Sequence, residues 1–261
     1  MKRKALLSIA SLLFAITLWG QDTITIYINN KEMTQVTEYA PDNKNKVTVT
    51  TYYKSGELCS QYRYSNYSER KFDGAQKEWY EGGQLRQYEE YENGRSNGKH
   101  KRWYENGQLR QEIDYKDGKF DGQILTYWEN GTAKRIDEYK NGELITGKCF
   151  NVNGEEIAHF NYIVHAIFPG GPEKLFQYLS NEPKYPRNSY RNKIEGKVIV
   201  EFAINTDGSI SDVVVTKSVS EDIDKEAIRV MKKMPKWIPS KIDGELITVF
   251  YTLPLQFRLT K

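Results

Sequence analysis

The segment Trp103-Tyr104-Glu105-Asn106-Gly107-Gln108-Leu109 decides the fold of the first half of the chain, because the chain repeats it at a spacing of 24 residues. Residues 79–85 and 127–133 are the neighbouring copies, and positions outside the segment align at the same spacing. Self-similarity at a fixed period is the sequence signature of a repeat architecture. The aligned columns are Gly74, Gly98 and Gly122; Trp79, Trp103 and Tyr127; Gly83, Gly107 and Gly131; Leu85, Leu109 and Ala133; Tyr91, Tyr115 and Tyr139; and Gly94, Gly118 and Gly142.

Each repeat is predicted to be a β-hairpin. Two short runs that contain Trp, Tyr or Leu flank Asn106-Gly107 or Asn130-Gly131, and Asp117-Gly118 or Asn141-Gly142 joins one repeat to the next. Asn-Gly and Asp-Gly pairs supply the positive φ angles that tight hairpin turns require. A single hairpin is only marginally stable in water, so we expect the hairpins to stack edge to edge into one elongated antiparallel sheet.

The repeats extend beyond the three best copies. A degenerate copy from about Thr51 contains Tyr53-Lys54-Ser55-Gly56-Glu57-Leu58, and a truncated last copy contains Val152-Asn153-Gly154. Four to five units are therefore expected between Thr51 and Ile157. The pattern resembles the bacterial variant of MORN repeats, and residues 103–109 carry the resemblance. The resemblance implies a binding or spacer surface.

The aromatic columns of the repeats allow two interpretations. In the first, the rings fill the thin core of the sheet, because so polar a chain has little else to bury. In the second, the rings form an exposed ladder that stacks on sugars, in outline like aromatic repeats that bind cell-wall glycans. The rings concerned are Trp79, Tyr91, Trp103, Tyr115 and Tyr139.

The composition excludes a wholly membrane-embedded protein. Of the 261 residues, 38% are hydrophobic, and the mean hydropathy is -0.72. Lys2, Arg3 and Lys4 are the only charges among the first 20 residues, and without them 35 basic residues stand against 35 acidic ones. Because nucleic-acid binding needs a surplus of Lys and Arg against phosphate, no nucleic-acid partner is expected.

The N-terminus has the three-part layout of an export signal. The basic residues at positions 2 to 4 precede an apolar run from Leu6 to Trp19, and the small residue Gly20 precedes Gln21. We expect export and cleavage near Gly20. The alternative is an uncleaved inner-membrane anchor, but ~14 helical residues at ~1.5 Å each would cover about 21 Å of a hydrocarbon core about 30 Å thick.

Two cysteines, Cys59 and Cys149, lie within the repeats. Export would permit a disulfide between them. In an open sheet about six strands would separate them, which is roughly 34 Å at about 4.8 Å per strand. A disulfide needs Cα atoms within about 7 Å of each other, so we expect Cys59 and Cys149 not to pair within one chain.

The period ends after His159, and the rest of the chain is predicted to fold separately as an α-β-β-α-β unit. The first helix is expected from Pro172 to about Leu179. The second is expected to begin near Ser220 and to end at Pro235, with an apolar stripe on one face. The predicted strands are Val198–Ile204, Ile210–Lys217 and Ile247–Leu259.

Short motifs follow one another in a fixed order along this second region. They are Phe168-Pro169-Gly170-Gly171, Tyr185-Pro186, Glu195-Gly196-Lys197-Val198, Asp207-Gly208, Glu226-Ala227, Met234-Pro235-Lys236-Trp237-Ile238-Pro239 and Leu253-Pro254-Leu255-Gln256-Phe257. Together they resemble the C-terminal domain of TonB, over roughly residues 168 to 261. The resemblance implies location in the periplasm of a Gram-negative cell envelope. It also implies binding of N-terminal segments of outer-membrane receptors, which pair with the last strand of the domain.

The last predicted strand is the expected partner site. An exposed strand edge binds an extended peptide by strand addition, and Pro254, which lacks a backbone donor, confines this strand to an edge or a bulge. The resemblance places Tyr185 and Pro186 beside the bound segment, although a rigid turn accounts for them equally well. Trp237 is expected to be a core residue. The expected partner-binding residues are Tyr185, Pro186, Thr248, Phe250, Thr252, Pro254, Gln256 and Arg258.

Two classes of function remain open. In the first, the protein supports TonB-dependent transmembrane transport, as a transducer coupled to an inner-membrane motor complex or as an adaptor. A transducer needs a membrane helix and a long proline-rich spacer, and here a short signal-like run and hairpin repeats take their places. In the second, it is a structural or glycan-binding envelope protein whose repeats bind peptidoglycan.

No enzymatic chemistry is predicted. The sequence lacks HExxH, Walker A and GxGxxG strings. Its GxSxG string, Gly94-Arg95-Ser96-Asn97-Gly98, falls within the predicted hairpin repeats and not between a strand and a helix. The three His have no metal-ligand spacing. We expect no enzyme activity, no cofactor and no metal. The predicted divisions are a signal peptide at 1–20, an N-terminal strand region at 21–50, the repeats at 51–157, a linker at 158–167 and the C-terminal domain at 168–261.

Overall fold

The structure is a computed structural model that describes residues 28–30, 33–40 and 42–259. The chain divides into two compact units between His159 and Phe160. The predicted signal segment, residues 1–20, lies outside the described residues. Among the residues that are described, no helix has the length and apolar character needed to cross a membrane.

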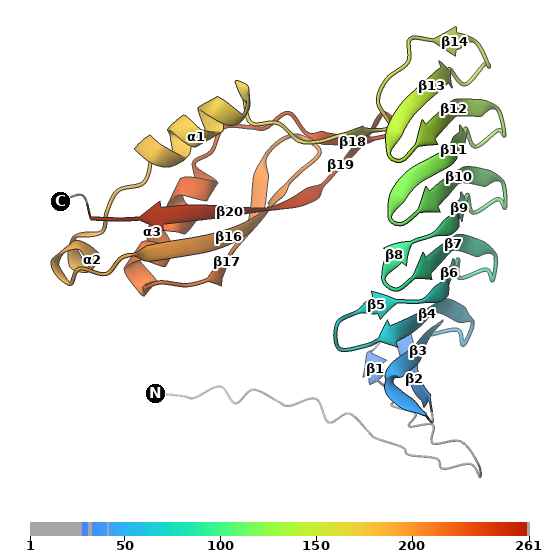
Figure 1. The fold of residues 1–261 in the computed structure, drawn as a ribbon, viewed down its shortest axis with the longest axis horizontal. Coiled ribbons are helices and arrows are strands. Elements are labelled where there is room, and N and C mark those ends of the chain that lie inside the picture. The colour runs from blue at the N-terminus through green and yellow to red at the C-terminus, as the bar shows by residue number, and fades with distance from the viewer. Residues whose placement is uncertain (1–27, 31–32, 41, 260–261) are drawn as a thin grey trace. The chain divides into compact units, whose positions relative to one another are not determined.

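The first unit is one antiparallel sheet of 14 strands. Along the main path of the sheet the strands lie in sequence order, so they follow one another as a ladder of hairpins (Figure 1). The short strands β5 and β8 pair beside β4 and β7, off the main path. This meander confirms the predicted sheet of stacked hairpins. The strands are β1 (Ile28–Asn30), β2 (Met33–Ala40), β3 (Asn43–Tyr53), β4 (Leu58–Asn66), β5 (Lys71–Phe72), β6 (Gly74–Trp79), β7 (Leu85–Glu92), β8 (Arg95–Ser96), β9 (Gly98–Trp103), β10 (Leu109–Lys116), β11 (Lys119–Tyr127), β12 (Ala133–Lys140), β13 (Glu143–Phe150) and β14 (Glu156–Ile157).

The turns take the backbone conformations that their residues predict. In the turn between β10 and β11, Asp117 and Gly118 both have positive φ, at 51° and 80°. Asn141 and Gly142 repeat this conformation between β12 and β13, at 53° and 89°. Two consecutive positive φ angles match the twist of the flanking strands, which is why the chain uses Asp-Gly and Asn-Gly there.

Hydrogen bonds between repeats hold the hairpins in register at both ends. At one end, an aromatic side chain that follows a strand donates to a backbone carbonyl of the next repeat. Tyr80 donates to the Trp103 carbonyl at 2.8 Å, and Tyr104 donates to the Tyr127 carbonyl at 2.9 Å. At the other end, the Gly118 amide donates to the carbonyl of Ser96 at 2.8 Å. The sequence analysis missed the column of aromatic donors, whose members are Tyr53, Tyr80, Tyr104 and Trp128.

A continuous ladder of rings runs along the sheet. Neighbouring ring centroids are between 4.4 and 5.3 Å apart, within the range of favourable aromatic contacts. Trp79 and Trp103, which the sequence groups with the periodic tyrosines, lie outside this ladder and are half-buried. The rings of the ladder, in order, are Tyr64, Phe72, Tyr91, His100, Tyr115, Phe120 and Tyr139.

The two cysteines are both free, so they do not pair, as expected. Cys59 lies in β4 and Cys149 in β13. The strands β6, β7, β9, β10, β11 and β12 separate them in the sheet order. The open sheet therefore explains why two cysteines of one chain do not pair.

The second unit is a small α+β unit with two sheets. One three-stranded sheet has the order β17-β16-β20, and the other has the order β15-β18-β19. The predicted helices and the first two predicted strands are confirmed, with ends shifted by at most three residues. Neither α2 nor the smaller sheet was predicted from the sequence. The elements are β15 (Ile163–Val164), α1 (Gly171–Asn181), α2 (Arg187–Arg191), β16 (Gly196–Ile204), β17 (Ile210–Lys217), α3 (Glu221–Lys232), β18 (Ser240–Ile242), β19 (Glu245–Ile247) and β20 (Val249–Phe257).

The core of this unit lies between the helices and the larger sheet. Trp237 is 5% exposed and its ring contacts Phe168, Phe202 and Tyr251 at centroid distances of 5.4, 6.2 and 5.6 Å. The prediction that Trp237 is a core residue is thus confirmed. The apolar stripe of α3 is also buried, at Ile223, Ala227, Val230 and Met231.

The predicted single strand Ile247–Leu259 is wrong in its limits. Ile247 ends β19, which pairs with β18 across the turn Asp243-Gly244, whereas β20 begins at Val249 and pairs with β16. Thr248 lies between the two strands, and Leu259 follows the end of β20. A change of strand partner at one residue leaves the alternation of side chains intact, so the sequence pattern does not reveal it.

We expect acid to destabilise the first unit through His100. This side chain is 6% exposed, and its Nε2 lies 2.9 Å from the Glu90 carbonyl. Burial lowers the pKa of His100, against the smaller effects of that carbonyl and of Glu89. Because the folded-state pKa is depressed, the unfolded chain binds the proton first. The contribution of the neutral His100 side chain to the free energy of unfolding is therefore present above about pH 6.5. It is lost as the pH falls below that value.

The substitution His100→Ile, which copies Ile124 from the equivalent position of the next repeat, should remove this pH dependence. The measurement is urea unfolding of the wild type and the variant between pH 7.5 and pH 5.5, followed by tryptophan fluorescence. Equal slopes of unfolding free energy against pH in both proteins would show that His100 is not the titrating group.

Candidate functional site

Strand β20 lies at one edge of its sheet. It pairs along its whole length with β16, from Gly196 opposite Phe257 to Ile204 opposite Val249. Among the described residues, no strand pairs with its other side (Figure 1). One side of β20 is therefore open to an incoming strand.

Pro254 fixes which backbone groups face the open side. It lies opposite Ile199 of β16, and it has no N–H with which to bond that strand. Backbone groups of a strand alternate between its two sides, and a proline is tolerated where its missing N–H would point outward. The N–H and C=O groups of Thr252 and Gln256, two positions away on either side, therefore point to the open edge.

The side chains of β20 divide between two faces. Leu255 and Phe257 are buried, and Tyr251 and Leu253 pack against the same core. The intervening side chains are exposed, including that of Phe250 at 65%. The exposed set, Phe250, Thr252, Pro254 and Gln256, consists of residues that the sequence analysis assigned to partner binding.

A hollow of about 500 Å³ lies beside the second half of β20. The second half of β20 forms one wall of the hollow, and α1 and the segment that follows α1 form the other wall. Most of its lining is apolar, and Arg258 is the one charged side chain of the lining. The lining residues are Phe176, Leu179, Ser180, Pro183, Tyr185, Pro254, Leu255, Gln256, Phe257 and Arg258.

Hydrogen bonds hold the wall of this hollow against the rest of the unit. The Tyr185 hydroxyl donates to the Ile194 carbonyl at 2.6 Å, and its ring contacts Phe257 at a centroid distance of 5.7 Å. The Tyr178 hydroxyl of α1 donates to the Val230 carbonyl of α3 at 2.9 Å. The hollow is therefore preformed between fixed elements.

A partly buried cluster anchors the short helix α2 to the start of α3. The Ser189 hydroxyl and backbone amide donate to the two oxygens of Asp222 at 2.6 and 3.1 Å, and Ser220 donates to the same carboxylate at 2.7 Å. These hydrogen bonds, that of the Ser189 side chain first, lower the pKa of Asp222 to about 2. A carboxylate bound only to hydroxyl and amide groups, with no imidazole, does not activate either serine as a nucleophile, so the cluster is structural.

The opposite edge of the sheet, β17, is less suited to strand addition. Asp212 has a positive φ of 49°, and the register with β16 shifts twice along β17. Such bulges interrupt the row of backbone groups and protect an edge from pairing. Of the two edges, β20 presents the regular one.

The structure brings only some of the predicted partner residues together. Tyr185, Pro254, Gln256 and Arg258 line the hollow, and Thr252 lies two residues before it on β20. Thr248 precedes β20, and Pro186 caps the N-terminus of α2 without lining the hollow. The Gln256 side chain also bonds the Gly196 carbonyl at 3.0 Å, so it faces β16 as well as the hollow.

Residues of α1 were missed as part of the site. Leu175, Tyr178 and Leu179 form the stripe of this helix that packs on the core, and Phe176 lies off that stripe. A large apolar residue outside the buried stripe was the available signal. Phe176 is 73% exposed.

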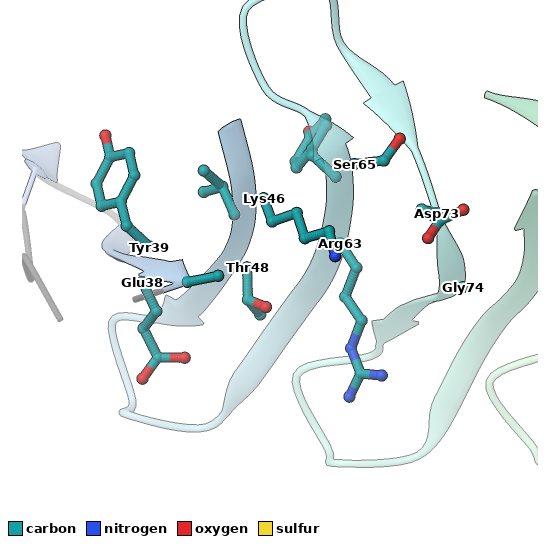
Figure 2. A pocket seen from close by; sticks show the side chains of 11 residues that line it. Glu38, Tyr39, Lys46, Thr48, Arg63, Ser65, Asp73 and Gly74 are labelled. Carbon is teal, nitrogen blue, oxygen red and sulfur yellow. The ribbon is translucent and has the colours of Figure 1, made fainter. Parts of the chain in front are cut away.

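A second hollow, of about 440 Å³, lies in the first unit, where β2, β3, β4 and the start of β6 meet (Figure 2). Lys46 extends toward Arg63 in this hollow, and Glu38 and Asp73 also line it. Two cations and two carboxylates balance each other, so the hollow favours no charged ligand. Within 28–30, 33–40 and 42–259, no group of His, Cys, Asp and Glu could hold a metal ion.

Two family models match the chain. Residues 181–259 match the family described as Gram-negative bacterial TonB protein C-terminal, and residues 72–93 and 96–117 match the MORN repeat variant. Both resemblances drawn from the sequence are confirmed for these ranges.

Known relatives match about a third of the chain. Proteins named TonB from two strains of Helicobacter pylori are each 32% identical to this chain over 87 residues, which is 33% of this chain and 30% or 29% of theirs. The chain thus spans less than a third of these relatives' length. Two solution structures of the Helicobacter pylori TonB C-terminal domain are 28% and 26% identical, each over 34% of this chain and over 94% and 80% of theirs, with TM-scores of 0.28.

Removing the Asp222 carboxylate should destabilise the second unit. Because its folded-state pKa of about 2 lies below an unfolded value near 3.9, its contribution is present above about pH 4 and is lost as the pH falls toward about 2. We expect Asp222→Asn to lower the melting temperature at pH 7 and to weaken the pH dependence between about pH 4 and 2. Thermal unfolding by circular dichroism measures both quantities.

Asp212→Asn, at an exposed position of β17, is the matched control and should leave both quantities unchanged. An Asp222→Asn protein with the melting temperature of the wild type would show that the cluster does not hold α2 in place.

Proposed function

We propose that the second unit binds extended N-terminal segments of outer-membrane receptors by strand addition to β20 and so supports TonB-dependent transmembrane transport. The open, regular edge of β20 is the single observation that carries the proposal. The match of residues 181–259 to the TonB C-terminal family supports it, as does the preformed hollow beside that edge.

We propose that the first unit acts as a spacer or docking surface within the periplasm. Every hairpin is bonded to its neighbours, so the sheet is suited to hold its shape over many repeats. The rings of the ladder contact one another. Outside the ladder, Arg86 and Arg110 cover the rings of Tyr80 and Tyr104, at 5.9 and 5.5 Å from the ring centroids. These contacts favour a structural role for the aromatics over stacking on peptidoglycan sugars.

We further propose that the chain is exported and acts as an adaptor rather than as a membrane-anchored transducer coupled to an inner-membrane motor complex. The short apolar run from Leu6 to Trp19 supports cleavage. Sequencing the N-terminus of the protein isolated from cells should give Gln21 or a neighbouring residue. An intact Met1 would contradict cleavage and favour the anchored transducer.

The substitution Thr252→Pro tests strand addition directly. It removes one outward backbone donor at an exposed position, while the core face of β20 stays unchanged. One lost hydrogen bond costs on the order of 1 kcal/mol, which is about fivefold in affinity. The measurement is calorimetric titration of a synthetic N-terminal receptor peptide into the full chain.

Thr252→Ala is the matched control, because it shortens the same side chain and keeps the backbone N–H. Its affinity should stay within about twofold of the wild type. Equal affinity of a folded Thr252→Pro protein and the control would place the bound segment elsewhere than on the edge of β20.

A further inference from the structure

The hollow lies where the side chains of an added strand would point. Residues directly opposite each other on neighbouring strands have side chains on the same face of the sheet. Segment residues opposite Leu255 and Phe257 would therefore point to the face that carries α1, where the hollow is. Residues opposite Pro254 and Gln256 would point to the exposed face.

The lining of the hollow matches large apolar side chains. Phe176, Leu179 and Pro183 line it from the helical side. On the side of β20 its apolar lining residues include Leu255 and Phe257, beside Pro254, Gln256 and Arg258. Its volume of about 500 Å³ falls within the range of roughly 300 to 1,000 Å³ that is typical of ligand pockets. Two alternate side chains of one extended segment would enter it together, because alternate residues share a face.

Phe176 is the part of this wall that the described residues leave most exposed. It has the largest exposed fraction, 73%, of the large hydrophobic residues described as exposed. A single exposed apolar residue is ordinary on a protein surface. Here, however, the residue adjoins both an apolar hollow and an unpaired strand edge, so an added strand would bury it.

Resting on the strand addition proposed above, we infer that the hollow selects segments with large apolar side chains at two alternate positions, and that Phe176 determines this specificity. The backbone of β20 holds any extended segment. The hollow then distinguishes segments by the side chains opposite Leu255 and Phe257. The partner class is an extended peptide that alternates apolar and polar residues.

Two synthetic eight-residue peptides with capped ends test this inference. The first alternates serine with valine, and the second alternates serine with threonine. Valine and threonine have the same branched shape, so the two peptides share their preference for an extended backbone and differ in apolar surface. The affinity of each peptide for the full chain is measured by calorimetric titration.

We expect the wild type to bind the valine peptide about tenfold more tightly than the threonine peptide. Phe176→Ala should reduce this preference to about twofold while leaving the affinity for the threonine peptide nearly unchanged. The control Val214→Ala removes exposed apolar surface from the other edge strand, β17, and should keep the full preference. Circular dichroism checks that each variant is folded.

Each other outcome has a separate meaning. Equal binding of both peptides by the wild type would overturn the inferred selectivity and leave strand addition standing. If a folded Phe176→Ala protein lost affinity equally for both peptides, the role of Phe176 in specificity would be overturned. Failure of the wild type to bind either peptide would contradict strand addition and, with it, the inference that rests on it.

Discussion

The need of every backbone N–H and C=O group for a partner organises both units of this chain. In the first unit, each strand bonds the next, and side chains such as Tyr80 and Tyr104 donate to carbonyl groups of the following repeat. In the second unit, β20 leaves one row of backbone groups without a strand partner among the described residues. An exposed row of this kind is a template for pairing, and the proposed function follows from it.

The sequence was most informative where a local pattern determines local structure. The 24-residue period predicted the hairpins and their turns, because Asp117-Gly118 and Asn141-Gly142 need no distant partner to adopt positive φ. The ring ladder was predicted only in part, because Phe72, His100 and Phe120 enter it from strands other than those of the periodic tyrosines. Their role depends on which strands become neighbours in the sheet. The alignment of the repeats, which shows only the residue type at each position, does not reveal which strands these are.

The candidate site was predicted only in part for a related reason. Alternation along the last strand identified the exposed side chains of β20 but did not reveal the break at Thr248, where the strand partner changes. The wall made by α1 is a tertiary feature, formed where that helix packs on α3 and beside β20. From the sequence, Phe176 was one apolar residue among several in a short helix, and its exposure was not apparent.

The central claim is that a partner segment pairs with the open edge of β20, and amide hydrogen exchange measures this pairing directly. Exchange rates of single amides in the full chain would be followed by NMR with and without a receptor N-terminal peptide. The account predicts slower exchange at Thr252 and Gln256 when the peptide is present, with the amides of β17 unchanged. Unchanged exchange at Thr252 and Gln256 under saturating peptide, or slowing confined to β17, would contradict it.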